Sequence, residues 1–173
     1  MKLLYIFAAL SLLLGALIFG FFYAWICSTM WGLDAIDPNV AIAAMQGMNA
    51  SVRNGVFAPA FFGTPFVMLA TAALAARHSL RAVMVAFGLA GLVYLFGGMV
   101  LTMAVNVPMN EALAEVALPL PEAQARAVWA EYSPRWQMFN VIRTGFSGLS
   151  LALAGLGVFA LGRAAAQRVS HRG

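Results

Sequence analysis

The sequence predicts an all-α protein: a four-transmembrane-helix bundle with short extracytoplasmic helices in the first and third loops. Three observations favour this fold. Of the 173 residues, 63% are hydrophobic and 9% are charged, whereas a soluble domain carries about 25% charged residues. Four stretches are apolar over the roughly 20 residues that a helix needs to cross a bilayer. Most lysines and arginines flank these stretches. Residues 1–173 are expected to form a single integral membrane domain.

The four spans are expected at about residues 3–30, 56–76, 82–107 and 134–162. The first span begins like a signal peptide, but its apolar run exceeds the roughly 7–15 residues of a signal sequence, so we interpret it as uncleaved. Pro65 should kink the second span, because proline removes a backbone donor. Pro108 is expected to stop the third span. Ser133 and Pro134 suit the N-cap and first position of the fourth.

The connections between the spans differ in kind. Residues 77–81 form a tight basic turn. Asp37 and Pro38 are expected to start a short helix that ends at Asn54-Gly55, where glycine would adopt the left-handed conformation of a helix cap. After the third span, a second short helix is expected to follow Pro121 and to end near Tyr132.

The distribution of charge predicts the orientation. One side of the predicted bundle holds six of the ten basic residues: Lys2, Arg77, Arg81, Arg163, Arg168 and Arg172. All six acidic residues fall on the other side. Because lysine and arginine near span ends stay in the cytoplasm, both termini should be cytoplasmic, as in a protein of the bacterial inner membrane. The net charge of +4 comes without a basic cluster interleaved with aromatics, so nucleic-acid binding is not expected.

Three elements each carry a polar face toward the outer half of the bundle. The fourth span has one at Trp136, Asn140, Arg143, Ser147 and Ser150, and the third at Tyr94, Gly98, Thr102, Asn106 and Asn110. The first-loop helix has one at Gln46, Asn49 and Arg53. Polar side chains that face lipid are costly, so these faces should turn toward the bundle or a cavity. Their convergence predicts a polar site.

Arg143 is the strongest indication of a site. Serine and asparagine often join membrane helices, at about 0.6 kcal/mol per hydrogen bond, and that reading accounts for any one of them. A buried guanidinium needs an acceptor, which could be Glu111, Glu115, Asp34 or a bound anionic or carbonyl-bearing ligand. The alternative is that Arg143 snorkels to the lipid headgroups.

Aromatic residues cluster just above the fourth span, at Trp129, Tyr132 and Trp136. Two interpretations stay open: an aromatic belt at the membrane interface, or a surface on which a flat ligand stacks.

The sequence predicts no metal site and no disulfide. The two histidines, His78 and His171, lie on the cytoplasmic side, away from the polar faces, so an imidazole-rich iron or zinc site is not expected. Cys27 is the single cysteine. Methionines at helical spacing could hold Cu(I) with Cys27, but such methionines usually serve packing.

Several segments resemble the anthrone oxygenase-like family of small four-helix integral membrane proteins, whose bacterial members are mostly uncharacterised. The resemblance is carried by residues 106–114 (NVPMNEALA), by Trp129, Tyr132 and Trp136, and by residues 140–144 (NVIRT). Residues 20–32, 45–49 and 61–64 also fit, so the similarity covers most of the chain. Fungal members are associated with oxidising an anthrone to an anthraquinone with O2, without a metal or flavin.

The resemblance implies a site and a chemistry. The site would contain Asn49, Asn106, Asn110, Trp136, Asn140 and Arg143. A phenol-like or anthrone substrate reacts with O2 as its enolate, so Arg143, with Asn106 and Asn140, would stabilise the negative oxygen, and Glu111 would be the base. Trp129 and Tyr132 would contact the ligand, and no cofactor is expected. Many relatives have a histidine after the asparagine of the fourth-span motif, where this chain has Val141.

Two other classes of function remain. The first is a non-enzymatic membrane module that binds a lipid, a quinone or a partner membrane protein. Small residues at Ala16, Gly20 and Ala24 give the first span a close-packing stripe that would suit a homo-oligomer. The second is a transporter, for which the Pro65 kink is the sole hint. Identifying small molecules that co-purify with the protein would separate a hydrophobic aromatic ligand from a protein partner.

Overall fold

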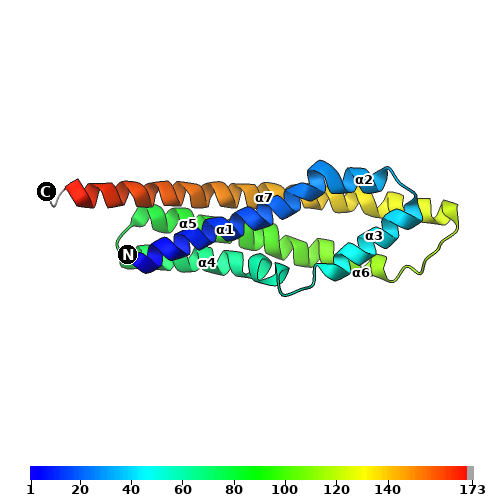
Figure 1. The fold of residues 1–173 in the computed structure, drawn as a ribbon, viewed down its shortest axis with the longest axis horizontal. Coiled ribbons are helices and arrows are strands. Elements are labelled where there is room, and N and C mark those ends of the chain that lie inside the picture. The colour runs from blue at the N-terminus through cyan, green and yellow to red at the C-terminus, as the bar shows by residue number, and fades with distance from the viewer. Residues whose placement is uncertain (171–173) are drawn as a thin grey trace.

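The computed structural model describes residues 1–170, so the predictions that concern His171 and Arg172 lie outside the described residues. The described chain is helical, and four of its helices are long and apolar enough to cross a membrane: Lys2–Asp34, Phe57–Arg77, Arg81–Ala114 and Glu122–Arg168. This confirms the predicted four-helix bundle of an integral membrane protein. The start of the first long helix, near Lys2, and the end of the last long helix, near Arg168, lie at the same end of the elongated bundle (Figure 1). We call the opposite end the distal end.

Several of the spanning helices are built from more than one segment. The first comprises α1 (Lys2–Ala24), the π-helical η1 (Trp25–Thr29) and α2 (Met30–Asp34); α3 (Pro38–Ser51) and α4 (Phe57–Arg77) follow. The third comprises α5 (Arg81–Tyr94), the π-helical η2 (Leu95–Val100) and η3 (Thr102–Asn106), and α6 (Val107–Ala114). The fourth, α7 (Glu122–Ser170), runs along the whole bundle (Figure 1).

The first loop begins as predicted but ends differently. The Asp37 carboxylate accepts hydrogen bonds from the backbone N–H groups of Asn39 (2.9 Å) and Val40 (3.3 Å), so it is the N-cap of α3. The predicted left-handed Gly55 cap is wrong, because no glycine in the described chain has a positive φ. Asn54 makes the turn instead. Its Oδ1 accepts hydrogen bonds from the backbone N–H groups of Val56 (2.8 Å) and Phe57 (2.9 Å), where the chain enters α4.

Two proline-based predictions of helix ends are also wrong. Pro108 does not stop the third spanning helix: it lies in the first turn of α6, where its missing N–H is tolerated, and the helix continues to Ala114. Pro134 lies inside α7. Ser133 does not cap a helix there, because its hydroxyl donates to Asp34 Oδ1 at 2.7 Å. The helix predicted for the third loop is therefore the first part of α7.

Packing at the distal end explains why α7 stays continuous. Apolar side chains of the first spanning helix, α3, α6 and α7 form one buried cluster there: Trp25, Met30, Leu33, Ala41, Ile42, Met45, Leu113, Ala125, Trp129, Tyr132 and Trp136. The Asp34 carboxylate also accepts hydrogen bonds from Trp129 Nε1 (2.9 Å) and Gln137 Nε2 (2.8 Å) of α7. These contacts hold the first turns of α7 in helical form and outweigh the local preference of proline for a helix start.

Small and hydroxyl-bearing residues join the spans within the bundle. The Ser11 and Thr71 hydroxyls lie 2.9 Å apart between α1 and α4. Ser150 of α7 donates to the Ala90 carbonyl of α5 at 2.8 Å. Ser147 donates within α7, to the Arg143 carbonyl one turn earlier, at 2.7 Å. Of the predicted α7 stripe, Ser150 therefore joins two helices, and the Ser147 hydroxyl is bonded to its own helix.

Gly97 marks the closest approach of α7 to η2, and its replacement should destabilise the protein. A Cβ at this position would lie 2.2 Å from Phe146 Cγ and 2.6 Å from Phe146 Cβ. Because Phe146 Cβ is fixed to the backbone, the helices themselves would have to separate. We expect Gly97→Ala to lower the free energy of unfolding by about 1–3 kcal/mol, measured as unfolding of the purified protein in detergent.

Gly155→Ala is the matched control, since a Cβ at Gly155 would meet nothing within 4 Å. Equal losses in the two variants would show that helix contact at Gly97 is not the cause.

Candidate functional site

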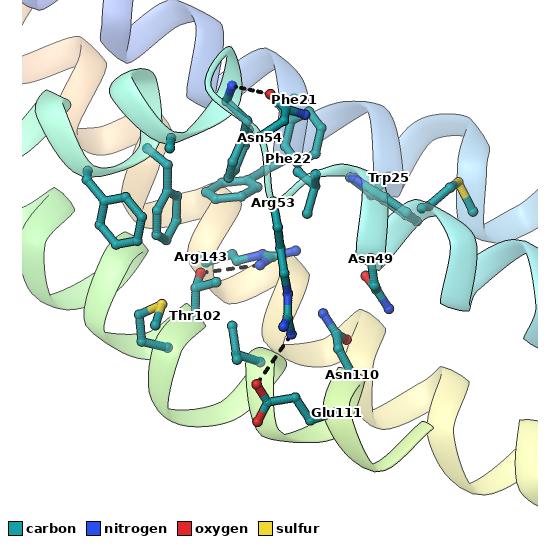
Figure 2. A pocket seen from close by; sticks show the side chains of 18 of the residues that line it. Phe21, Phe22, Trp25, Asn49, Arg53, Asn54, Thr102, Asn110, Glu111 and Arg143 are labelled. Atoms are coloured by element: carbon teal, nitrogen blue, oxygen red, sulfur yellow. Dashed lines mark hydrogen bonds and ion pairs between the residues drawn. The ribbon is translucent and has the colours of Figure 1, made fainter. Parts of the chain in front are cut away.

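A cavity of about 580 Å³ lies between the four spanning helices and the α3–α4 connection. Its volume falls within the roughly 300–1,000 Å³ of sites for small molecules. One part of its wall is aromatic: Phe21, Phe22, Trp25, Phe57, Phe61, Phe62 and Trp136. The other part is polar: Asn49, Arg53, Asn54, Thr102, Asn110, Glu111 and Arg143 (Figure 2). The cavity therefore suits a flat molecule with a polar edge.

Arg143 supplies the central charge of the polar wall. Its side chain comes from α7 and is 5% exposed, which contradicts the snorkelling alternative. Nε donates to Asn140 Oδ1 at 2.9 Å, and Nη1 donates to Thr102 Oγ1 at 3.2 Å (Figure 2). Within residues 1–170, Nη2 has no hydrogen-bond acceptor. A guanidinium carries five N–H donors, so this group retains donors for a ligand.

Two aromatic rings flank the guanidinium of Arg143. Its central carbon lies 4.3 Å from the centroid of Phe22 and 5.0 Å from that of Trp136. A cation at this distance from a ring face is attracted to it, by about 2 kcal/mol or more when desolvated. Phe22 was not among the predicted site residues. A phenylalanine in an apolar span gives no signal that separates it from its neighbours.

Arg143 has no carboxylate partner in the described part of the chain. The salt bridges there join Arg53 to Glu111 and Arg126 to Glu122. Of the three acids proposed as acceptors, Glu111 pairs with Arg53, Asp34 is bound by α7, and Glu115 makes no contact with Arg143. A desolvated positive charge next to an open cavity favours a ligand that brings a negative or partly negative oxygen.

Asn140 and Asn106 lie behind the cavity wall rather than on it. Asn140 accepts from Arg143 Nε and donates to the Phe22 carbonyl at 3.2 Å, so it fixes the guanidinium relative to α1. Asn106 is fully buried and donates to the Trp136 carbonyl at 3.5 Å. Its Oδ1 has no partner among the described residues. In this arrangement both amides can act on a ligand only through neighbouring side chains.

Asn110 joins the aromatic residues of α7 to the cavity. Its Oδ1 accepts from Tyr132 Oη (2.8 Å) and from Trp136 Nε1 (2.9 Å). Asn110 and Trp136 line the cavity, whereas Tyr132 and Trp129 lie outside its lining, in the distal apolar cluster. The three aromatics predicted as a group thus separate into one wall residue and two that support the wall.

Residues from α3, from the α3–α4 connection and from α6 form the mouth of the cavity. Arg53 Nη2 lies 3.3 Å from Glu111 Oε1, and each side chain is 59% exposed (Figure 2). Asn49 lines the cavity beside them, and its buried Nδ2 makes no hydrogen bond of ordinary geometry within the described chain. Gln46, the third member of the predicted α3 face, instead donates to the Leu113 and Val116 carbonyls and holds α3 against α6.

The π-helical segments explain how one stripe of the third spanning helix reaches the site. Its members recur every four residues, at 94, 98, 102, 106 and 110. In an α-helix each step would drift by about 40°, and the stripe would turn away from α7. A π-helix has more residues per turn, so η2 and η3 keep Thr102, Asn106 and Asn110 directed at α7. The repeated spacing of four was the signal in the sequence.

In the described residues, no group of three or more His, Cys, Asp or Glu side chains comes together as a metal site would require. The polar groups that line the cavity are amides, a hydroxyl and guanidinium groups, together with one exposed carboxylate. Such a set suits an oxygen-bearing organic ligand.

Comparison with protein-family models identifies the family of this chain. The anthrone oxygenase family model matches residues 55–153, which is more than half of the chain. The chain belongs to the anthrone oxygenase family. Searches of curated proteins and of solved structures each gave no match. The part that the anthrone oxygenase model matches supplies Thr102, Glu111, Asn140 and Arg143, whereas the α1 and α3 walls of the cavity lie outside it.

Val141, the residue after Asn140, does not belong to the cavity of this anthrone oxygenase family member. It is 53% exposed and is not among the residues that line the cavity. A residue at this position therefore does not contact the cavity in this structure.

Proposed function

We propose that this member of the family is a cofactor-independent oxygenase that acts on an aromatic or phenolic, anthrone-like substrate. One observation carries the proposal: the buried guanidinium of Arg143 has no carboxylate partner among residues 1–170 and faces a cavity walled by aromatic rings. A flat substrate would stack on the rings and place its oxygen at the free Nη2 of Arg143. The proposal also places the termini in the cytoplasm and the cavity near the outer face of a bacterial inner membrane.

The chemistry needs a stabilised enolate and no external reductant. Loss of a proton from the ring CH2 of an anthrone gives an enolate, whose charge rests largely on oxygen. Arg143 would bind that oxygen, and a preorganised cation in a water-poor site favours its formation. The enolate then reacts with O2. Overall, the CH2 and O2 give C=O and H2O: the CH2 loses four electrons, one oxygen atom enters the ketone and the other leaves as water.

Glu111 is the proposed base. It is the carboxylate that lines the cavity, and its Oε1 accepts from Arg53 at the mouth. A carboxylate at the mouth can pass the proton to water, while the enolate stays inside with Arg143. Asn140 and Thr102 would act as positioning residues, because their contacts fix the guanidinium.

The test is oxygen labelling with the purified protein in liposomes, with anthrone as the probe and ¹⁸O2 as the oxidant. We expect protein-dependent formation of anthraquinone, one labelled oxygen in each product molecule and one O2 consumed per anthrone. Protein-free liposomes and heat-denatured protein give the background. Binding of anthrone without oxygen consumption above that background would overturn the oxygenase and leave a non-enzymatic binding module.

A further inference from the structure

A second hollow of about 450 Å³ lies beside the cavity and shares part of its wall. We call it the lateral vestibule. The shared wall includes Phe21, Trp25, Val52 and Phe57. Among the described residues, no charged side chain lines the vestibule, whereas the cavity holds Arg53, Glu111 and Arg143. Ser51 and Asn54 are the polar members of a vestibule lining that is otherwise apolar, so the vestibule suits hydrocarbon better than an ion.

The vestibule opens at the side of the bundle, between α1 and α4. The start of α1 lies beside the end of α4, and the two helices diverge toward the distal end (Figure 1). Two residues that line the vestibule but not the cavity are largely exposed: Leu17 by 53% and Val56 by 87%. Leu17 lies within a segment apolar enough to span the membrane, and Val56 directly precedes another. Entry from the bilayer requires that their exposed surfaces face hydrocarbon.

Two phenylalanine rings separate the vestibule from the cavity. The centroids of Phe21 and Phe57 lie 4.8 Å apart, and each ring lines both spaces. Their neighbours are also aromatic: Phe57 stacks on Phe61 at 5.3 Å, and Phe21 meets Trp25 edge-on at 6.3 Å. Such contacts are held by packing alone. Rotation of one ring therefore breaks no hydrogen bond or salt bridge, in contrast to the mouth, where Arg53 and Glu111 must part.

We propose that the lateral vestibule is the entrance by which a flat aromatic molecule dissolved in the bilayer reaches the cavity, with Phe21 and Phe57 as the gate. The identity of that molecule as substrate rests on the proposed function. The route needs no transfer of the molecule into water: it passes from lipid to an apolar hollow and then between two rings. Its oxygen meets the first charged groups, Arg143 among them, only inside the cavity.

The experiment measures entry without turnover, using anthracene as the probe. Anthracene has no oxygen to bind Arg143 and no CH2 to oxidise, so the result does not depend on the oxygenase proposal. Liposomes that contain the protein are mixed with anthracene-loaded vesicles, and energy transfer from tryptophan reports entry. Trp25 lines both spaces. Ala60→Phe fills the vestibule from a position that does not line the cavity, and Phe57→Ala removes half of the gate.

We expect Ala60→Phe to slow the rise of energy transfer about tenfold with little change in its final level, and Phe57→Ala to speed it. Ala73→Phe is the matched control, because Ala73 is exposed on α4 and lines neither space. Unchanged rates in both test variants, or no energy transfer in the unmodified protein, would overturn the lateral entrance. The oxygenase proposal would survive either result if labelled anthraquinone still forms, because substrate would then enter by the mouth.

Discussion

Arg143→Gln is expected to lower the rate of anthrone-dependent oxygen uptake by about 10²–10³-fold, the usual effect of removing one donor that stabilises a developing oxyanion. Glutamine keeps a hydrogen-bonding group near Thr102 and Asn140 but removes the charge that offsets the enolate. The loss should appear in kcat and in kcat/KM alike, because the negative oxygen exists only after the proton has left. Oxygen-electrode measurements on protein in liposomes would check this.

Two further variants make the result specific to the guanidinium of Arg143. Arg143→Lys keeps the charge but loses the planar fork that holds Asn140 and Thr102, so it should retain intermediate activity. Arg135→Gln removes an arginine from the exposed face of the same helix and should leave the rate unchanged. Full activity in a folded Arg143→Gln protein would exclude Arg143 from the chemistry.

Glu111→Gln is the second large expected effect, a fall of about 10²-fold in the rate of oxygen uptake, which is typical for loss of a general base. Stability should change little. The Arg53–Glu111 pair is more than half exposed, and exposed pairs contribute about 0–1 kcal/mol. Oxygen uptake and thermal unfolding measured on the same preparation would separate the two effects.

The control for this prediction is Glu115→Gln, which removes an exposed carboxylate four residues further along that does not line the cavity. A normal rate in Glu111→Gln would mean that water, rather than the carboxylate, takes the proton. An equal fall in both variants would indicate a general effect of surface charge near the mouth.

The fold could be predicted because its causes are local. Bilayer thickness sets the length of an apolar span, so composition alone located four of them. Asp37-Pro38 gave the start of α3 because the N-cap bonds involve residues only two and three positions away. The polar faces converge as predicted where their partners are also side chains on facing helices, as for Arg143 and Thr102.

The errors arose where distant contacts override a local preference. Ser133-Pro134 has the composition of a helix start, but the Ser133 hydroxyl donates its hydrogen bond to Asp34, 99 positions away. Packing at the distal end keeps α7 continuous there. Phe22 was missed for the same reason. It approaches Arg143 from another span, and the sequence of an apolar helix does not indicate which of its faces meets a charge. None of the acidic residues offered as acceptors pairs with Arg143 in the described chain, where an amide, a hydroxyl and ring faces surround the guanidinium instead.

The uninterrupted course of α7 has a mechanical consequence. Its 49 residues extend over about 74 Å, more than twice the roughly 30 Å thickness of the hydrocarbon. The same helix therefore carries both the buried Arg143 and the distal side chains that donate hydrogen bonds to Asp34. Because both places lie on one continuous helix, a tilt of α7 would displace them together.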